Sequence, residues 1–578
     1  MSIDGGAIQM RNKLLQKDRI TGSEILLRIL LLEGVECVFG YPGGAVLYIY
    51  DAMHGDEQFR HLLTRHEQGA IHAADGYARS TGKVGVCIAT SGPGATNLVT
   101  GIATAYMDSI PLVVITGNVP TSLIGTDSFQ EADIIGITQP ITKHSYFVRR
   151  VEELASTIRE AFYIANSGRK GPVLIDIPKD VSAALTEFDY PQGAISIRGY
   201  KPQPEVSAAR IEEMLSLITE ADKPLILSGG GLVQSDGAEE LMEFAEKTNI
   251  PVTTTLLGLG GFPSRHELWL GMPGMHGTYA ANQALLACDL LISVGARFDD
   301  RVTMRLDGFA PHAKIVHIDI DAAEIGKLVP TALPVEGDAK EILQRANARL
   351  HHATKSNKAW LRQVWEWKAE VPLKYRDSET ELKPQYVLEM ISKTTGGEAI
   401  ITTDVGQHQM WTAQFYRFQN PRSIITSGGL GTMGFGFPAA IGAQIGNPGK
   451  LVISINGDGG MQMCAQELAI CAIHNIPVKI IVINNQTLGM IKQWQELIYE
   501  GRFSHIDLSG SPDFVKLAEA YGVKGLRAST KQEADQVWQE ALQTAGPVLI
   551  DCMVAKDELV FPMIPQGKAL SDMIMGDV

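Results

Sequence analysis

Residues 451–485 read LVISINGDGGMQMCAQELAICAIHNIPVKIIVINN, and this stretch decides the expected fold. Apolar, β-branched runs at 451–455 and 478–483 flank a segment long enough for one helix, which is the pattern of a βαβ unit. A right-handed crossover makes the two strands parallel, so both carboxyl ends face the sheet edge where ligands of α/β folds bind. Asp458 follows the first strand and Asn485 follows the second. A carboxylate and an amide oxygen at this edge suit Mg2+, which takes few protein ligands beside phosphate and water.

Glycines surround this aspartate, and Gly457 and Gly459 would let the backbone approach a phosphate group closely. Gly-Asp-Gly and Asn-Asn are each also ordinary turn sequences, favoured by turn chemistry alone. Their combination at this spacing, in a strand–helix–strand frame, favours the ligand site.

Composition limits the class of protein. A chain of 578 residues is too long for one core and predicts three or four domains. The net charge of -15 argues against nucleic acid as a partner, and no apolar run approaches the roughly eighteen residues that span a membrane. The amino-terminal sequence has no apolar signal core, so we expect a cytoplasmic protein. The six cysteines form no C-x-x-C pair and are expected to be core residues rather than a metal or redox site.

A weaker copy of the same pattern lies near the amino terminus, at residues 84–118. Both copies run from a strand through a Gly-x-Gly turn and a helix to Ile-Pro and a second strand. Pro93 stands where the later copy has Asp458, so the first copy lacks the metal ligand. Two domains of one fold with complementary defects suggest one cofactor held between them.

The predicted fold class is α/β, with three doubly wound parallel-sheet domains at 20–190, 200–350 and 384–555. A Rossmann G-x-G-x-x-G fingerprint would need glycine where Gln234 stands, so the middle domain is not a standard NAD site. Its strands are expected in four apolar runs: PLILSGGG (224–231), PVTTTLLGLG (251–260), DLLISVGARFDD (289–300) and KIVHIDID (314–321).

The GDG sequence, followed by 24 residues and NN, resembles the thiamine-diphosphate motif. Nearly the whole chain resembles the catalytic large subunits of acetohydroxyacid synthase, also called acetolactate synthase. The resemblance rests on FGYPGGAV (39–46), RHEQGA (65–70), SGPGATN (91–97), GTDSFQEAD (125–133), GARFDDRV (295–302), GLGTMGFG (429–436) and GMIKQWQ (489–495). It implies thiamine-diphosphate domains at both ends and a Rossmann-like, FAD-binding domain between them.

The resemblance assigns the cofactor contacts of the third domain. Asp458 and Asn485 become side-chain ligands of Mg2+, with the backbone carbonyl of Thr487 as a third. Gln407 and His408 match diphosphate contacts, and Met433 matches the large residue that props the cofactor into its bent shape. On sequence alone, His408 would pass as a structural residue and Met433 as core.

Glu67 is the expected proton-transfer residue. On a helix it would line up with Ile71, Ala74 and Ala78, and a carboxylate in line with an apolar stripe is costly to bury. The alternative is that Glu67 lies at the helix start and reaches water. The resemblance makes it the glutamate that bonds the cofactor's aminopyrimidine ring, and places it on a different subunit from the diphosphate motif. This requires a homodimer or a larger assembly, and a regulatory small subunit is a further candidate partner.

The implied reaction is the decarboxylation of pyruvate and transfer of the two-carbon unit to pyruvate or 2-oxobutyrate. The products are 2-acetolactate or 2-aceto-2-hydroxybutyrate, in the first common step of valine, leucine and isoleucine biosynthesis. Gln130 and the backbone around Gly44 are the family's polar contacts near the reacting oxygen.

For the second 2-oxo acid, Arg301 is the candidate carboxylate contact, because a guanidinium can bind a carboxylate with two hydrogen bonds. Its alternative is an ion pair with Asp299 or Asp300. The remaining substrate candidates are Lys179, Met490 and Trp494. Met490 and Trp494 are four apart on one helix face, where plain core packing is the alternative.

The resemblance also implies an FAD without a net redox role. The sequence RFDDR distinguishes this family from flavin-free acetolactate synthases. The candidate FAD contacts are Arg169, Gly229, Gly230, His276, Arg297, Asp319 and Asp338.

Three other functions compete. A flavin-dependent pyruvate oxidase of the same superfamily would pass electrons to FAD. A glyoxylate carboligase should carry an apolar residue in place of Glu67, so the glutamate counts against it. A non-catalytic binding module would not need Glu67, Asp458 and Asn485 together.

Overall fold

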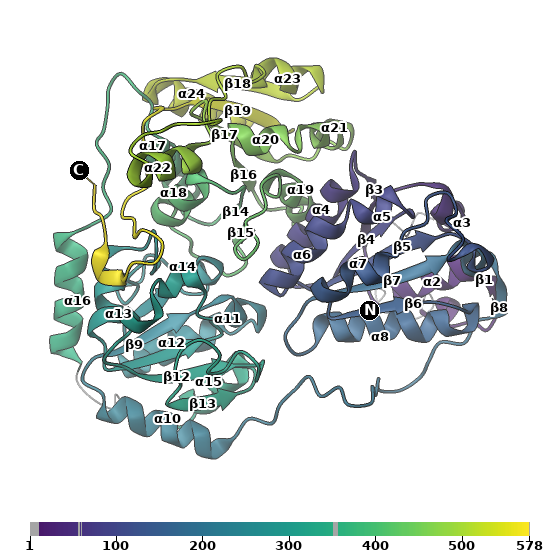
Figure 1. Cartoon of the computed structure of the whole chain (residues 1–578), viewed down its shortest axis with the longest axis horizontal. Coiled ribbons are helices and arrows are strands. Elements are labelled where there is room, and N and C mark those ends of the chain that lie inside the picture. Colours follow the sequence, from purple (N-terminus) through teal and green to yellow (C-terminus); the bar gives the residue numbers. More distant parts are fainter. Residues whose placement is uncertain (1–10, 56–57, 59, 351–356, 577–578) are drawn as a thin grey trace, which may run out of the picture. The chain divides into compact units, whose positions relative to one another are not determined.

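Three parallel β-sheets organise the chain in the computed structural model, which describes residues 11–55, 58, 60–350 and 357–576 (Figure 1). The expected α/β class with three parallel-sheet domains is confirmed. The chain divides into two compact units. One holds the chain up to Tyr200 with Gly429–Pro448 and Cys464–Ile476, and the other holds Lys201–Gly428, Gly449–Met463 and the chain from Pro477 onward.

The first sheet has the strand order β3-β2-β4-β5-β7-β6, and every neighbouring pair is parallel. A short antiparallel pair, β1 (Arg19–Thr21) with β8 (Leu185–Glu187), joins the two ends of this region. The sheet strands are β2 (Cys37–Tyr41), β3 (Arg60–Leu63), β4 (Gly85–Ala89), β5 (Leu112–Asn118), β6 (His144–Phe147) and β7 (Pro172–Pro178). The main helices are α2 (Gly22–Leu32), α4 (Glu67–Thr81), α6 (Val99–Asp108) and α8 (Leu154–Asn166).

The middle sheet has the order β10-β9-β11-β12-β13 and is parallel throughout. Its strands fall in the four expected runs, with β13 as a fifth. They are β9 (Pro224–Ser228), β10 (Val252–Thr254), β11 (Leu290–Val294), β12 (Lys314–Asp319) and β13 (Leu333–Glu336). The helices include α10 (Ala208–Glu220), α11 (Gly230–Gln234), α12 (Ala238–Thr248), α13 (Tyr279–Ala287), α15 (Ala339–Asn347) and α16 (Lys358–Glu370).

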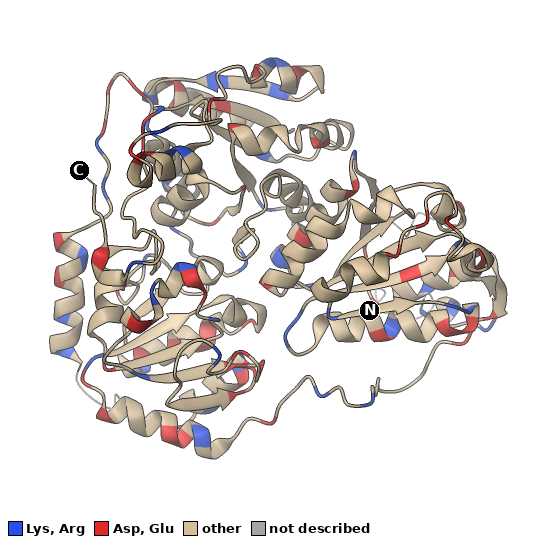
Figure 2. Ribbon diagram, viewed as in Figure 1, with Lys and Arg blue, Asp and Glu red and all other residues tan. Residues whose placement is uncertain are grey.

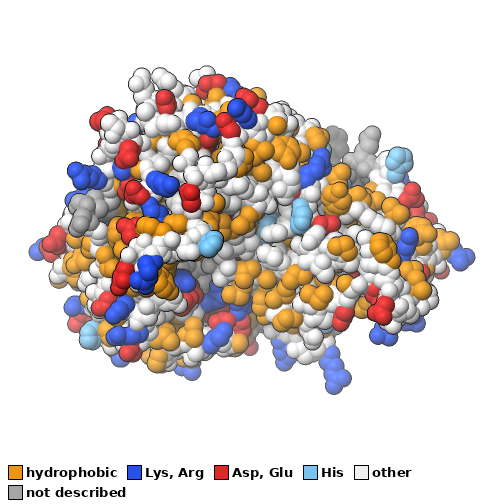
Figure 3. Space-filling view, turned by 45° about the horizontal axis from the view of Figure 1, so that its top comes forward, with side chains coloured by type: hydrophobic (Ala, Val, Ile, Leu, Met, Phe, Trp, Pro, Cys, Tyr) orange, Lys and Arg blue, Asp and Glu red, His pale blue; other side chains and the backbone are white. Residues whose placement is uncertain are grey.

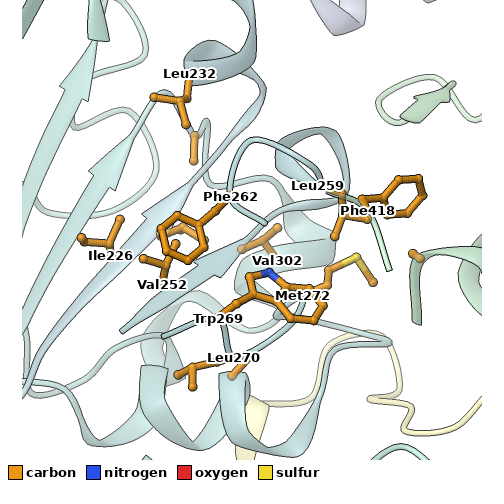
Figure 4. Packing of buried hydrophobic residues seen from close by; sticks show 14 of the residues in the cluster. Ile226, Leu232, Val252, Leu259, Phe262, Trp269, Leu270, Met272, Val302 and Phe418 are labelled. Carbon is orange, nitrogen blue, oxygen red and sulfur yellow. The ribbon is translucent and has the colours of Figure 1, made fainter. Parts of the chain in front are cut away.

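Large apolar side chains fill the core beside this middle sheet. Figure 4 shows Phe262 over Val252 and close to Ile226, all three fully buried. The Trp269 ring is buried in the same cluster, and its Nε1–H donates to Thr254 Oγ1 at 3.1 Å, so its one polar atom keeps a partner. The burial of these rings stabilises the unit.

The third sheet has the order β15-β14-β16-β17-β19-β18 and is also parallel. Its strands are β14 (Ile400–Thr403), β15 (Ile424–Thr426), β16 (Val452–Gly457), β17 (Lys479–Asn484), β18 (Lys524–Ala528) and β19 (Val548–Met553). Its helices include α17 (Pro384–Thr395), α18 (Gln407–Phe415), α22 (Gly489–Ile498), α23 (Phe514–Ala520) and α24 (Lys531–Gln543).

The deciding stretch forms the expected parallel pair, because β16 and β17 are direct neighbours. The single helix expected between them was wrong. The segment instead forms α20 (Asp458–Gln462), a 3-10 turn at Ala465–Glu467, and α21 (Leu468–Ile473). Cys464 leaves the helical conformation, with φ at -138°, and this residue separates the first helix from the others.

Helix α4 is almost wholly buried because α19 (Gly436–Gly446) packs against it through small residues. A Cβ on Gly76 would lie 2.0 Å from the carbonyl oxygen of Ala439, and a Cβ on Gly442 would lie 1.7 Å from that of Ala73. Glycine is therefore required at both positions for the two backbones to approach this closely.

Charged side chains lie mainly on the helices and connecting segments, while most strands are free of them (Figure 2). On the face drawn in Figure 3, basic and acidic side chains are interspersed. Among the described residues, no helix combines the length and apolar character that a membrane crossing requires. All six cysteines are buried, as expected for core residues.

Candidate active site

The predicted metal ligands lie at the carboxyl edge of the third sheet. Asp458 begins α20 directly after β16, and Asn485 follows β17; both are buried. Asp458 Oδ1 accepts from the Gly459 N–H at 3.0 Å, whereas its buried Oδ2 has no hydrogen-bond partner. Burial raises the pKa of Asp458 to about 6, partly offset by the backbone N–H groups of Gly459 and Gln486. This buried carboxylate oxygen has no hydrogen-bond donor, and a bound cation would be the partner that it needs. The residues at this edge therefore fit Mg2+.

The Asn485 side chain has a defined orientation. Its Nδ2 donates to Gln407 Oε1 at 3.3 Å, and its Oδ1 accepts from the Thr487 N–H at 3.3 Å. Thr487 is buried, and its hydroxyl donates to the Ile506 carbonyl. The described residues contain no group of three or more His, Cys, Asp or Glu that could hold a metal. The predicted set does not need one, since it combines one carboxylate with amide and carbonyl oxygens.

The two predicted diphosphate contacts open helix α18. Gln407 reaches toward Gly489, where a Cβ would lie only 2.0 Å from its Oε1. His408 is buried beside Gly457, and its Nε2 has no hydrogen-bond partner. Burial lowers the pKa of His408 to about 4, so its imidazole is neutral at neutral pH. A buried neutral ring with an unused nitrogen fits a hydrogen bond to a ligand better than it fits a structural role.

Glu67 is the first residue of α4 and is half-buried. The apolar stripe predicted below it is confirmed, since Ile71, Ala74 and Ala78 are buried. Glu67 Oε2 accepts from Asn97 Nδ2 at 2.9 Å. The carboxylate therefore lies at the helix start, as the alternative had it, with one oxygen oriented by an amide.

The other two predicted catalytic positions lie at the same sheet edge as Glu67. A Cβ on Gly92, whose φ is +61°, would lie 2.9 Å from the carbonyl oxygen of Gln130. A Cβ on Gly94 would lie 3.3 Å from Glu67 Oε1. The turn 90–94 thus touches both residues, and Thr90 Oγ1 accepts from the Ala45 N–H next to Gly44 at 3.2 Å.

Lys179 is near this group. It begins α9 (Lys179–Ala183) after β7, and its Nζ lies 5.9 Å from the centre of the Tyr48 ring. Tyr48 lies on α3 (Leu47–Ala52), which follows the 3-10 turn Gly44–Val46. The predicted substrate lysine is therefore close to the Gly44 loop.

A buried ion-pair cluster anchors the segment that carries Met433. Arg79 bonds Asp75 at 2.5 Å and Asp108 at 3.0 Å, and Asp108 Oδ1 accepts from the Gly429 N–H at 2.7 Å. The Thr432 and Thr104 hydroxyls are hydrogen-bonded at 2.7 Å. Met433 itself is partly exposed, so it is not the core residue that the sequence alone would suggest.

Glu467 was not predicted as a site residue, yet it lies at the start of α4. Its two oxygens accept from the Arg65 N–H at 3.1 and 3.2 Å, and a Cβ on Gly69 would lie 2.4 Å from its Oε1. Burial raises the pKa of Glu467 to about 7, against the backbone N–H and positive charge of Arg65. No local pattern marked this residue, because its contacts are about 400 positions away in the sequence.

The predicted acceptor residues are only partly buried. Met490 and Trp494 lie on one face of α22 and pack against the core, but Leu497 and Ile498 farther along are exposed. Simple core packing therefore does not describe the whole face. Arg301 has the alternative partner considered above, since its Nη1 lies 3.7 Å from Asp300 Oδ2. Both side chains are more than half exposed, so this ion pair contributes little stability and leaves the guanidinium accessible.

The FAD candidates of the middle domain have identified neighbours. Gly229 approaches the backbone of Gly295 and Ala296, where a Cβ would lie 2.3 Å from the Gly295 carbonyl oxygen. The glycine there is explained by chain packing. A Cβ on Gly230 would lie 3.1 Å from the Leu257 Cβ and 3.7 Å from the Leu257 carbonyl oxygen. His276 is buried, its Nδ1 lies 3.1 Å from the Pro562 carbonyl oxygen, and burial lowers its pKa to about 4.

The remaining FAD candidates serve local structure as well. Asp319 Oδ1 accepts from the Asp321 N–H, and Asp338 caps α15 by accepting from the Glu341 N–H. Arg297 lies near Asp299, whose pKa it lowers against the larger raising effect of burial. Arg169 belongs to the first unit, where its Nε donates to Ser109 Oγ at 2.9 Å. These contacts neither require nor oppose a flavin.

Two further residues were missed by sequence reasoning. Asn97 orients Glu67, and Gln493 connects Gln407 to the carboxyl-terminal segment. A signal for Gln493 existed, because a polar residue three positions after Met490 falls on the buried side of an amphipathic helix.

Family comparisons agree with this arrangement of sheets and turns. Residues 20–137 match the family model described as "Thiamine pyrophosphate enzyme, N-terminal TPP binding domain". Residues 211–346 match the central domain, and residues 404–552 match the C-terminal TPP binding domain, of the same enzymes. The chain therefore belongs to the thiamine pyrophosphate (diphosphate) enzymes.

Relatives along nearly the full length narrow this class. The chain is 50% identical to the acetolactate synthase large subunit of Corynebacterium glutamicum, over 98% of this chain and 92% of the relative. It is 46% identical to the acetolactate synthase large subunit of Haemophilus influenzae, over 96% and 98%. A probable acetolactate synthase large subunit of Methanocaldococcus jannaschii is 50% identical, over 96% and 95%. The chain belongs to the acetolactate synthase large-subunit family.

Proposed function

We propose that the protein is the catalytic subunit of an acetolactate synthase, which decarboxylates pyruvate and joins the two-carbon unit to a second 2-oxo acid. The observation that carries the proposal is the 46–50% identity to acetolactate synthase large subunits over at least 96% of the chain. With pyruvate as the acceptor the product is 2-acetolactate, and with 2-oxobutyrate it is 2-aceto-2-hydroxybutyrate. These names favour the synthase over the pyruvate oxidase of the same superfamily.

Thiamine diphosphate, when bound, supplies the carbon nucleophile and stores the electron pair released as carbon dioxide leaves. The chain's own residues hold and orient it. Asp458, Asn485 and the Thr487 carbonyl hold Mg2+, supported by the unpartnered Asp458 Oδ2. His408 presents a neutral ring with an unused nitrogen, and Gln407 stands next to Asn485.

Glu67 holds the proton that is exchanged with the cofactor's aminopyrimidine ring, and Asn97 keeps the carboxylate oriented. Gln130 and the Gly44 backbone contact the reacting oxygen. Their support is their common position around the turn 90–94.

Substrate choice is assigned to exposed or half-buried groups. Arg301 binds the acceptor carboxylate, which its accessible guanidinium permits. Met490 and Trp494 contact its side chain, and Lys179 lies near the Gly44 loop. Met433 props the cofactor from a segment fixed by Asp108.

The proposal includes an FAD bound through the seven middle-domain and Arg169 contacts named above. It also includes a homodimer or larger assembly in which Glu67 of one copy faces Asp458 of another. The relatives' names specify a large subunit, and this supports a search for a smaller partner chain. The domain limits 20–190, 200–350 and 384–555 remain proposed, and each family match falls within one of them. The cytoplasmic location also remains a prediction.

One assay tests the central proposal. Purified protein is incubated with pyruvate, Mg2+, thiamine diphosphate and FAD, and acetolactate is measured while the flavin spectrum is recorded without oxygen. The synthase forms acetolactate and leaves the bulk flavin oxidised. Bleached flavin with acetate or acetyl phosphate as the product would instead establish the oxidase.

A further inference from the structure

A chain of side-chain amides connects the carboxyl-terminal segment to the proposed metal ligand Asn485. Gln493 lies on α22 and is fully buried. Its Oε1 accepts from the Val560 N–H and from Gln407 Nε2, both at 2.9 Å. Gln407 Oε1 in turn accepts from Asn485 Nδ2 at 3.3 Å. The three amides are therefore hydrogen-bonded in series inside the unit.

Backbone groups set the direction of this series, because their roles as hydrogen-bond donors or acceptors are fixed. A side-chain amide can be turned over, with its oxygen and nitrogen swapped, but a backbone N–H only donates and a carbonyl only accepts. Val560 presents both to Gln493, since its carbonyl also accepts from Gln493 Nε2 at 2.9 Å. The Glu558 carbonyl likewise accepts from Gln407 Nε2 at 3.1 Å.

The consequence reaches the metal ligand. Because Gln493 must direct its oxygen at Val560 N–H, Gln407 must direct its nitrogen at Gln493 and its oxygen at Asn485. Asn485 then directs its nitrogen at Gln407, and its oxygen lies on the other side, where the Thr487 N–H also donates to it. An amide coordinates Mg2+ through oxygen, so this is the orientation that the metal requires.

We propose that Gln493 is a positioning residue. The backbone of Val560 fixes the orientation of the Gln493 amide, Gln493 fixes that of Gln407, and Gln407 directs the Asn485 oxygen toward Mg2+. The proposal rests on the Mg2+ assignment made above. Gln493 itself touches neither the metal ligands nor, on this proposal, the cofactor.

The same helix contains a matched control. Gln495 binds Ser504 in the same two-bond manner, with Nε2 donating to the Ser504 carbonyl at 3.1 Å and Oε1 accepting from its N–H at 3.0 Å. Gln495 is only half-buried, and its hydrogen bonds do not lead to Gln407. A substitution at 495 therefore removes two equivalent hydrogen bonds to the backbone and leaves the Gln493–Gln407–Asn485 series intact.

The experiment titrates the full-length apoprotein with Mg2+ at saturating thiamine diphosphate and follows binding by tryptophan fluorescence, without turnover. Gln493→Leu should weaken the apparent Mg2+ affinity by about 10–100-fold, the usual scale for losing a partner that orients a metal ligand. Gln495→Leu should stay within about twofold of the wild type. Gln493→Glu keeps an oxygen that accepts from Val560 and Gln407 but loses the donor to the Val560 carbonyl, so it should recover only part of the affinity. Equal Mg2+ affinity in Gln493→Leu and Gln495→Leu would overturn the proposal.

A double-mutant cycle tests the route. In a Gln407→Ala background, Gln493→Leu should lower the Mg2+ affinity by less than about twofold, because the series of hydrogen bonds is already broken. If Gln493→Leu lowers the Mg2+ affinity as much in this background as in the wild type, Gln493 does not act through Gln407, and the proposal is overturned. If Gln493→Leu does not fold, the wild type decides: Mg2+ with thiamine diphosphate should slow hydrogen exchange at the Val560 amide, and an unchanged rate would contradict the coupling.

These outcomes are distinct from failure of the proposed function. A wild type that binds Mg2+ and responds to Gln493→Leu but forms no acetolactate would remove the synthase assignment and keep the positioning role. A wild type that forms acetolactate while Gln493→Leu binds Mg2+ normally would do the reverse.

Discussion

The turn after β4 and the turn after β16 connect the same kinds of secondary structure but present different chemical groups. Each follows a buried parallel strand and leads into helix and a second parallel strand. At 92–94 the turn reads Gly-Pro-Gly, and at 457–459 it reads Gly-Asp-Gly. The second turn supplies a carboxylate with an unpartnered oxygen, whereas the first is followed by Asn97, which donates to the carboxylate of Glu67.

The comparison shows that the fold sets the position of each turn at the sheet edge, whereas the side chains in and near the turn set its chemistry. One sheet edge offers an oxygen that a cation can bind, and the other orients an acid that can exchange a proton. The following predictions test this division, beginning with the largest expected effect.

Asp458→Ala should abolish Mg2+-dependent binding of thiamine diphosphate, because one of the two proposed side-chain ligands is lost and the diphosphate charge stays unneutralised. Pro93→Ala, the equivalent change in the first turn, should leave Mg2+ binding intact. Calorimetric titration of both variants measures this contrast. Ordinary Mg2+ affinity in Asp458→Ala would remove the metal assignment.

Glu67→Gln should still bind the cofactor but turn over at least about 100-fold more slowly, the usual scale for losing a positioned proton-transfer group. The direct measurement is hydrogen–deuterium exchange at the reactive carbon of the bound cofactor. Asn97→Ala should give a smaller loss in the same assay, since the carboxylate remains and only its orientation is released. An exchange rate in Glu67→Gln equal to that of the wild type would exclude Glu67 from the mechanism.

Glu467→Gln should change how stability depends on pH. The pKa of Glu467 is raised to about 7, so its favourable contribution is complete below the unfolded value of 4.5 and is lost as pH rises through about 7. Near pH 8 the ionised, buried carboxylate costs about 3 kcal/mol, which the glutamine avoids. The variant should therefore melt higher than the wild type at pH 8, and the difference should shrink or reverse toward pH 5.

A control for this measurement is Glu36→Gln, which removes an exposed carboxylate paired with Lys83. Exposed pairs contribute little, so its melting temperature should follow the wild type at both pH values. Parallel pH profiles for the wild type and Glu467→Gln would show that Glu467 stays ionised in the folded protein.

Trp494→Leu should keep acetolactate formation from pyruvate and lose most of the preference for 2-oxobutyrate. One methylene in an apolar pocket is worth about 1–3 kcal/mol, or roughly 10–200-fold in preference. The product ratio is measured when both acids compete, together with the melting temperature. If the ratio stays constant while the melting temperature collapses, Trp494 is a packing residue.

The sequence predicted those features that are local or repeated. Strands β16 and β17 lie within a residue or two of the expected runs, and the parallel pairing followed from the βαβ pattern. The broken helix between them was not predicted, because Cys464 and the 3-10 turn after it have no strong signal of their own.

Long-range contacts were beyond sequence reasoning. Glu467 meets Arg65, and Gln493 meets Val560 and Gln407, through partners that only the folded chain brings together. The Gly229 position gives the opposite lesson. The family resemblance makes Gly229 a candidate FAD contact, but the neighbouring Gly295 backbone already requires a glycine there.

The close packing of α19 on α4 also sets an order of events during synthesis. The first compact unit includes Gly429–Pro448 and Cys464–Ile476, so the ribosome must add roughly 280 residues after Tyr200 before that unit is complete. At roughly 5–20 residues per second this takes about 14–55 seconds, and the face of α4 that packs against α19 has no partner until Gly446 has been added. A nascent chain in this interval presents an apolar surface to chaperones, and fragments that end before 429 should be prone to aggregation.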